Sequence, residues 1–242
     1  EDLSRCRSSI IIVRNVISFS EEVTQELENF MSNEDNVPQT LNQWGRYLLR
    51  RQATFGAAYN FGQSNVTIPY PVNSWPQAVQ LALTTAKSMA AELGINPELY
   101  NGVHANWYPN GRSGVDPHSD KETDMVKGMP IFSFTLLAGN IVPRNFSIYR
   151  PPNAAEIESQ QNEHEQKQSR HKISTAKKAT KEKDFKPEPI LLYNIRLGHG
   201  DVLIMQGDMQ TYYKHAVNRD MRKSLSNARR LNLTVRAFQQ TE

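Results

Sequence analysis

The segment 230–236 reads Arg-Leu-Asn-Leu-Thr-Val-Arg and alternates strictly between polar and apolar residues. Side chains of a strand alternate between its two faces, so the apolar residues would pack on one face and the polar ones would share the other. That polar face would carry Arg230, Asn232, Thr234 and Arg236. Such a strand is either a sheet edge with one face in water, or it lies inside the protein against something anionic.

The rest of the chain predicts helices first and strands afterwards. Two helical patterns cover residues 18–31, where Ser18 and Glu21 have capping-box spacing, and residues 76–93, which follow Ser74 as a cap. Runs rich in branched and aromatic residues then cover 102–108, 131–138, 146–150, 190–197, 201–206, 211–217 and 231–238. We therefore expect a mainly β (α+β) fold, a sandwich or barrel buttressed by N-terminal helices.

One charged stretch, residues 151–189, interrupts this pattern between two predicted strands. It is rich in Glu, Gln and Lys and poor in large apolar residues, so it cannot bury enough surface to offset the entropy of ordering. We expect a disordered or loosely helical insertion there. All 242 residues would form a single domain, in which residues 1–100 supply the N-terminal helices and residues 101–242 supply the β core.

A metal site is indicated by His118 and Asp120. Two residues apart on an extended segment, they project to the same face and can hold one ion together with a third ligand. His199 lies in a glycine-flanked turn, 198–201, where a histidine more plausibly braces the turn, so we favour His215. Two imidazoles and one carboxylate on one side of Fe(II) form a facial triad that leaves positions open.

Such an iron centre needs a reductant for dioxygen, and the strand 230–236 supplies a place for one. Arginine pairs with carboxylates through two parallel hydrogen bonds, so two arginines on one face suit a dicarboxylate. Asn106 and Tyr108 alternate correctly on the strand before the metal triplet to add hydrogen bonds. Together these features predict a 2-oxoglutarate site.

In order and spacing, these motifs resemble the AlkB family of Fe(II)- and 2-oxoglutarate-dependent dioxygenases. The resemblance spans residues 44–238 without the insertion and rests on Asn106-Trp107-Tyr108, the run 118–122, the turn 198–201, His215 and Arg230-x-Asn232-x-Thr234-x-Arg236. It implies a double-stranded β-helix of the jelly-roll or cupin-like kind and dioxygen as a cosubstrate. It also implies a catalytic iron held by His118, Asp120 and His215, and 2-oxoglutarate held by Asn106, Tyr108, Arg230, Asn232 and Arg236.

A second stretch, residues 51–62, resembles the nucleotide-recognition hairpin of AlkB homologues that repair duplex DNA. In that family aromatic side chains of the hairpin stack on an extruded base, which implies substrate contacts from Tyr59 and Phe61, and from Glu122 to the exocyclic amine. Basic residues on either side of the site are candidate phosphate contacts. They are Arg46, Arg50 and Arg51 on one side, and Arg219, Arg222, Lys223 and Arg229 on the other.

The resemblance implies oxidative demethylation of N-alkylated bases of the 1-methyladenine or 3-methylcytosine type, with DNA repair as the role. Duplex or single-stranded DNA is the expected partner, and RNA is an alternative. Two other functions stay open: a 2-oxoglutarate oxygenase acting on a protein or small molecule, and a catalytically silent β-barrel that binds nucleic acid. A pI near 8.9 favours a polyanionic partner, and the single cysteine fits a reducing compartment. We expect an intracellular monomer, nuclear or cytoplasmic, without a membrane partner.

Overall fold

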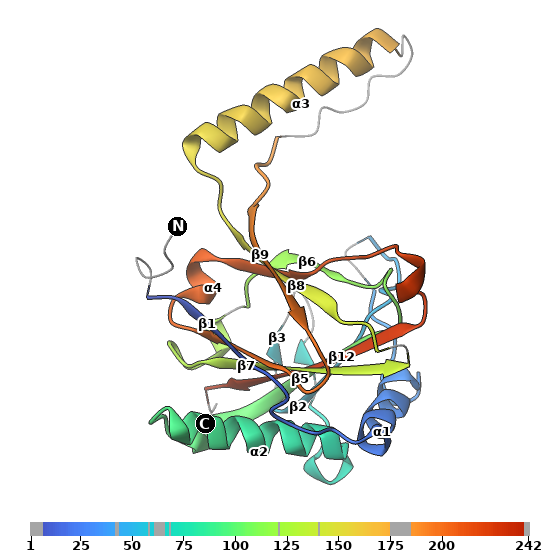
Figure 1. The fold of residues 1–242 in the computed structure, drawn as a ribbon, viewed down its shortest axis with the longest axis vertical. Coiled ribbons are helices and arrows are strands. Elements are labelled where there is room, and N and C mark those ends of the chain that lie inside the picture. Colours follow the sequence, from blue (N-terminus) through green and yellow to red (C-terminus); the bar gives the residue numbers. More distant parts are fainter. Residues whose placement is uncertain are drawn as a thin grey trace.

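The computed structural model of the chain describes residues 7–41, 44–57, 59–60, 66–67, 69–120, 122–139, 141–174 and 185–239. Two antiparallel sheets lie face to face, and two helices cover the outer face of the larger sheet (Figure 1). This is the mainly β architecture with helices that the sequence predicts, and it is consistent with a jelly-roll core. No helix within the described ranges is both long and apolar enough to cross a membrane.

The larger sheet has six strands, and its order places the polar strand in the interior. In sheet order they are β1 (Ser9–Val13), β10 (Val202–Gln206), β7 (Ile131–Gly139), β12 (Ala228–Ala237), β5 (Tyr100–Tyr108) and β2 (Arg51–Gly56). Because β12 pairs with β7 on one side and β5 on the other, it is no sheet edge.

The smaller sheet has four strands, in the order β6 (Val115–His118), β11 (Lys214–Val217), β8 (Arg144–Arg150) and β9 (Ile190–Leu197). A separate short pair is formed by β3 (Tyr59–Asn60) and β4 (Val66–Thr67). Short 3-10 helices are η2 (Val72–Ser74), η3 (Pro97–Leu99), η4 (Glu122–Asp124) and η5 (Lys223–Leu225). The space between the two sheets is where the candidate site lies.

Two hydrophobic cores lie on the two faces of the larger sheet. The outer one is formed with α1 (Glu21–Ser32) and α2 (Gln77–Glu92), and it takes up Leu231, Leu233 and Val235 of β12. The inner one lies between the sheets and includes Ile148, Leu203 and Met205. The apolar side chains of β12 therefore pack against the helices, and its polar side chains face the smaller sheet, which confirms the predicted alternation.

Local details of the helices differ from the sequence-based prediction. Ser20, not Ser18, caps α1, because its side chain accepts from the backbone N–H of Val23. Pro76 occupies the N-cap of α2, and the hydroxyl of Ser74 instead donates to Pro71 O. The predicted strand 211–217 is wrong in its first half. A short helix, α4 (Met209–Tyr212), precedes β11 there, and the chain enters it from Gly207, whose positive φ of 65° forms the turn.

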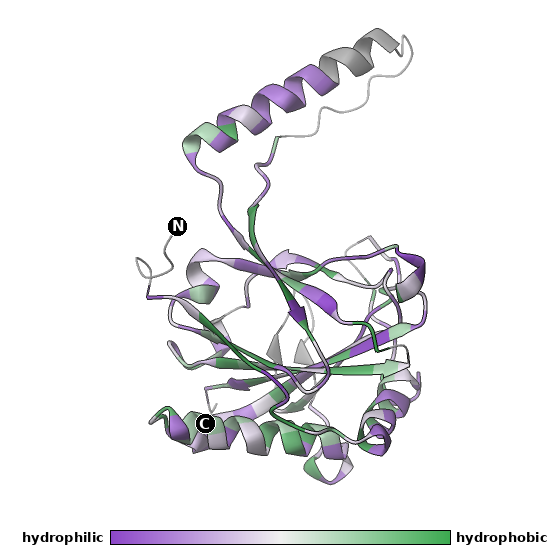
Figure 2. Ribbon diagram, in the orientation of Figure 1, coloured by the Kyte–Doolittle hydropathy of each residue, from purple (hydrophilic) through white to green (hydrophobic). Residues whose placement is uncertain are grey.

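The charged stretch 151–189 contains a helix, α3 (Ala154–Ser174), that extends away from the two sheets (Figure 1). Its start is a reciprocal cap: Glu156 N–H donates to Asn153 Oδ1, and Asn153 N–H donates to Glu156 Oε2. Arg150 also pairs with Glu156 through both of its terminal nitrogens. Figure 2 shows that most of α3 is hydrophilic. Local capping, and not burial, accounts for this helix.

Candidate active site

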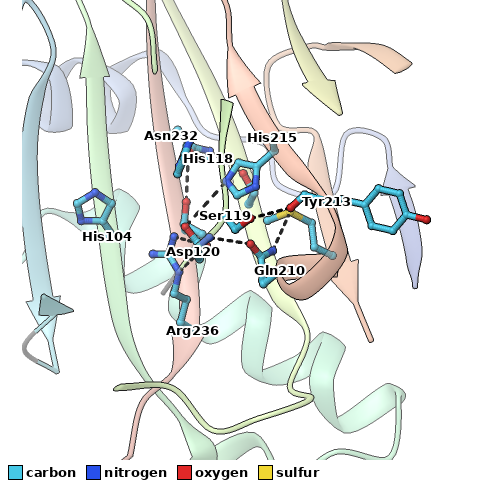
Figure 3. Close-up of polar contacts among 12 residues, drawn as sticks. His104, His118, Ser119, Asp120, Gln210, Tyr213, His215, Asn232 and Arg236 are labelled. Carbon is cyan, nitrogen blue, oxygen red and sulfur yellow. Dashed lines mark hydrogen bonds and ion pairs between the residues drawn. The ribbon is translucent and has the colours of Figure 1, made fainter. Parts of the chain in front are cut away.

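Three potential metal ligands converge between the sheets (Figure 3). His118 is the last residue of β6 and lies opposite His215 of β11, with the ring centroids 4.4 Å apart. Asp120 follows two residues later, and its Oδ1 is 3.9 Å from His215 Nε2. The ligand atoms of the three residues all lie within 4.8 Å of one another. The structure therefore brings His118, Asp120 and His215 together, as a shared metal ion would require.

Neighbouring groups fix the orientation of both imidazoles. Nδ1 of His118 is 2.9 Å from Asp116 O, and since a carbonyl only accepts, Nδ1 carries the proton and Nε2 keeps its lone pair. His215 stacks on Phe146 at a centroid distance of 5.4 Å and an interplanar angle of 12°. Such contacts set the tautomer and ring direction that a metal ligand needs.

The protonation states suit a divalent cation. Burial, together with the nearby His118, lowers the pKa of His215 to about 3. Burial also lowers the pKa of His118, against a smaller opposing effect of Asp120. Burial acts to raise the pKa of Asp120, but Arg236 and the two histidines outweigh it and hold that pKa below its ordinary value. Two neutral imidazoles and one carboxylate are the forms that coordinate a metal.

Arg236 is engaged with Asp120 in this structure. Its Nε and Nη2 both donate to Asp120 Oδ2, at 3.1 and 2.7 Å, and both side chains are buried. The assignment of Arg236 to 2-oxoglutarate stays a prediction. Its direct contact here is with the carboxylate of the triad.

Arg230 is the strongest candidate for holding an anion. It is only 1% exposed, and Nη2 donates to Thr135 Oγ1 at 3.1 Å, whereas Nη1 has no hydrogen-bond partner among the described residues. Its guanidinium lies 5.5 Å from the ring centroid of Tyr108, and within the described portion of the chain it has no carboxylate partner. Burial lowers its pKa to about 10, so it stays charged at neutral pH.

The two asparagines of the predicted cosubstrate site differ. Asn106 has a buried Oδ1 with no partner in the described segments of the chain. Asn232 already uses its amide: Nδ2 donates to Ser133 Oγ and Phe134 O at 2.8 Å each, and Oδ1 accepts from Thr234. A bond from Asn232 to a cosubstrate would have to replace one of these. Arg230, whose Nη1 has no hydrogen-bond partner among the described residues, fits a carboxylate of 2-oxoglutarate.

His199 lies outside the triad. Its Nδ1 is within hydrogen-bond distance of both the N and O of Leu137, and its Nε2 is 3.0 Å from Phe19 O. It therefore holds the turn before β10 against the start of α1, as expected from the flanking glycines.

Only some of the predicted substrate contacts fall within the described residues. Tyr59 lies in β3, and Glu122 begins η4, but their side chains, like the whole of Phe61, are outside the described residues. Arg51 lies on the outer face of β2, where it donates to Val37 O at 2.9 Å and stacks on Trp107. Arg51 therefore does not lie in the space between the sheets. Its contact with a phosphate, outside that space, stays a prediction.

Two of the other predicted phosphate contacts are paired with carboxylates. Arg222 binds Asp220 through Nε and Nη2, and Arg229 forms an ion pair with the buried Glu28 of α1. The charge of Arg50 contributes to the lowered pKa values of His104 and His118, which indicates that Arg50 lies near the site.

Several polar residues of the site were not identified from the sequence. Among them are Ser133 and Thr135, which alternate on β7 and support the polar face of β12. Their period-two spacing on a strand next to β12 was the available signal. Arg144 is buried with four backbone carbonyls around it and stacks on Tyr108 at 5.6 Å. No local pattern marks it.

A comparison with protein families identifies the family of this chain. The family model of the 2OG-Fe(II) oxygenase superfamily matches residues 20–236. No curated protein matches the sequence. Among solved structures, a Pseudomonas putida prolyl-4-hydroxylase is similar at 11% identity over 98% of this chain and 96% of that one, with a TM-score of 0.47. A Trichoplax adhaerens prolyl hydroxylase, solved with a hypoxia inducible factor peptide fragment, is similar at 10% identity over 98% and 85%, with a TM-score of 0.47.

Proposed function

The chain belongs to the 2OG-Fe(II) oxygenase superfamily, and on that premise we propose that it is an AlkB-type dioxygenase that demethylates N-alkylated bases in nucleic acid. Its metal is Fe(II), and 2-oxoglutarate and dioxygen are its cosubstrates. The observation that carries the proposal is that Arg230, Asn232, Thr234 and Arg236 form one buried face of β12. That face lies against the triad through the contact of Arg236 with Asp120.

Each site residue has a role in this proposal. His118, Asp120 and His215 hold Fe(II), and Arg236 keeps Asp120 ionised with Oδ2 occupied and Oδ1 directed toward His215. Arg230 receives a carboxylate of 2-oxoglutarate. The surrounding inner core excludes water, which strengthens these charge interactions.

When bound, the iron centre supplies the oxidation of a methyl C–H bond by dioxygen, while 2-oxoglutarate leaves as succinate and carbon dioxide. The product is a hydroxymethyl group on the base nitrogen. The C–N bond of this group then breaks, formaldehyde leaves, and the nitrogen regains its hydrogen or lone pair. The chain contributes orientation and exclusion of water.

A second segment, called here the aromatic hairpin because it carries the exposed Trp44 and Tyr47, supports nucleic acid as the substrate class. Leu41 and Tyr47 form a β-bridge across a turn that includes Gly45, whose φ is 71°. Trp44 and Tyr47 are 74% and 67% exposed, and Arg46 lies between them in sequence. Exposed aromatic rings next to arginine are the groups that stack on bases and contact phosphates.

The test is mass spectrometry of oligonucleotides carrying 1-methyladenine or 3-methylcytosine, as single and double strands of DNA and of RNA, after incubation with enzyme, Fe(II) and 2-oxoglutarate. We expect loss of the methyl group with equivalent succinate and formaldehyde, and no loss with His118→Ala. Intact oligonucleotides together with succinate formed on peptides or small molecules would overturn the substrate class. Absence of any 2-oxoglutarate turnover would favour a silent barrel.

A further inference from the structure

The backbone that carries the carboxylate ligand of the triad lies outside the strands. His118 ends β6, so Asp120 has already left the strand ladder that fixes the two histidines. The position of Asp120 therefore has to be set by other contacts. Arg236 of β12 holds the carboxylate group itself, whereas α4 and the residue that follows it hold Ser119 and the backbone of Asp120.

Two hydrogen bonds connect this segment to Asp120 and its neighbour (Figure 3). The backbone N–H of Asp120 donates to Gln210 Oε1 at 2.8 Å, and the hydroxyl of Ser119 donates to Tyr213 O at 2.8 Å. Gln210 is itself buried, and its Nε2 donates to Met205 Sδ at 3.4 Å. The two bonds tie both residues after His118 to the segment that leads into β11.

The direction of the Gln210 amide follows from these partners. A backbone N–H is only a donor, so the oxygen of Gln210 must face Asp120 and the nitrogen must face the sulfur of Met205. Without that oxygen the buried N–H of Asp120 would lose its partner, which is costly enough for the backbone to move. A small movement there would displace the carboxylate from His118 and His215.

We propose that Gln210 is a positioning residue for the metal: through the backbone of Asp120 it places the carboxylate beside His118 and His215 before the ion binds. The inference rests on the proposed function only in taking these three residues as ligands. Groups that orient a ligand commonly contribute a factor of about 10 to 100 to metal affinity. A merely structural hydrogen bond would change the stability of the metal-free protein and leave that affinity unaltered.

Gln210→Met is the main variant, because it keeps the volume of the side chain and removes the acceptor. Gln206→Met is its matched control: Gln206 accepts from Ser9 Oγ at 3.0 Å and has no bond to the segment 118–120. Mn(II) alone is the probe, with free ion measured by electron paramagnetic resonance. Urea unfolding of the metal-free proteins is measured in parallel. We expect Gln210→Met to bind Mn(II) about 10-fold or more weakly, and Gln206→Met to bind it as the wild type does.

Wild-type Mn(II) affinity in Gln210→Met would overturn the proposal, as would an equal loss in Gln206→Met. If Gln210→Met does not fold, Ser119→Ala replaces it, with weaker Mn(II) binding expected and unchanged binding contradicting the inference. His118→Ala distinguishes the role of Gln210 from the assignment of the metal ligands. If His118→Ala no longer binds Mn(II) but Gln210→Met binds it fully, only the role of Gln210 is refuted. If His118→Ala binds Mn(II) fully, the ligand assignment is refuted, and the inference with it.

Discussion

Arg236 holds one carboxylate oxygen of Asp120 with two nitrogens, and the other oxygen of Asp120 lies toward His215. The strand that first suggested an anion site thus supplies a cation to the metal site as well. Its two arginines differ: one is paired with a carboxylate of the protein, and Arg230 has no carboxylate within the described residues. Replacing Arg236 and replacing Arg230 are therefore expected to have different consequences.

Replacing Arg236 with methionine is expected to destabilise the metal-free protein by about 3 to 5 kcal/mol, because a buried carboxylate would lose its partner. Urea unfolding of the metal-free protein measures this. The double variant Asp120→Asn with Arg236→Met removes both charges and should recover some of the loss. A double variant less stable than Arg236→Met alone would contradict the pairing.

Replacing Arg230 with methionine is expected to leave the metal-free protein as stable as before or to stabilise it by about 1 kcal/mol, since it removes a buried cation that lacks a carboxylate partner. The stabilisation that 2-oxoglutarate gives by binding the folded state should disappear. Thermal unfolding with and without 2-oxoglutarate in the presence of Mn(II) measures both effects. The exposed Arg112→Met is the control, and a retained 2-oxoglutarate shift in Arg230→Met would refute the assignment.

The alternation of residues 230–236 was sufficient to predict which side chains of β12 share a face, because the two-residue period is a property of the strand alone. It could not decide between an edge strand and a central one. The position of β12 in the sheet depends on its pairing with β7 and β5. Paired residues of β12 and β7 are about a hundred positions apart in sequence, and those of β12 and β5 are farther apart. The choice of His215 over His199 agreed with the geometry because glycines mark a turn locally.

Other features could not be predicted from local patterns. Residues 211–217 have strand-like composition, yet their first half is helical, because tertiary contacts override weak propensity over so few residues. Gln210 and Arg144 act through backbone groups of distant segments, and no spacing rule marks such bonds. The stretch 151–189 was predicted to be a disordered or loosely helical insertion from its composition. Composition does not indicate the cap between Asn153 and Glu156, which begins a helix there.

Asp201 predicts a pH dependence of stability. Its Oδ2 accepts from Gly198 N–H at 2.7 Å, its Oδ1 accepts from Asn15 N–H at 3.3 Å, and Arg14 pairs with it. Burial acts to raise the pKa of Asp201, but these bonds outweigh it and lower the pKa below the ordinary value. A lowered folded-state pKa means that the stabilisation is present above the unfolded-state pKa of about 4 and is lost as the pH falls through the folded-state pKa.

Asp201→Asn should therefore cost about 2 kcal/mol of unfolding free energy at pH 7, where the charge-assisted bonds are made. The difference from wild type should shrink as the pH falls below about 4. Urea unfolding at several pH values measures it. Arg14→Met is the control for the half-exposed ion pair and should have a small effect, because such pairs contribute little. A pH-independent difference between Asp201→Asn and wild type would contradict the role of the charge.

The aromatic hairpin provides the prediction closest to substrate recognition. Trp44→Ala and Tyr47→Ala each remove a large exposed ring, and stacking on a base contributes about 1 to 3 kcal/mol. We expect each variant to bind a methylated oligonucleotide about 5-fold to 100-fold more weakly in fluorescence anisotropy, with unchanged Mn(II) affinity. Val72→Ala is the control, because Val72 is 72% exposed but not aromatic. If Trp44→Ala and Tyr47→Ala bind the oligonucleotide as Val72→Ala does, the hairpin is not a nucleic-acid contact, and the case for a nucleic-acid substrate loses its structural support.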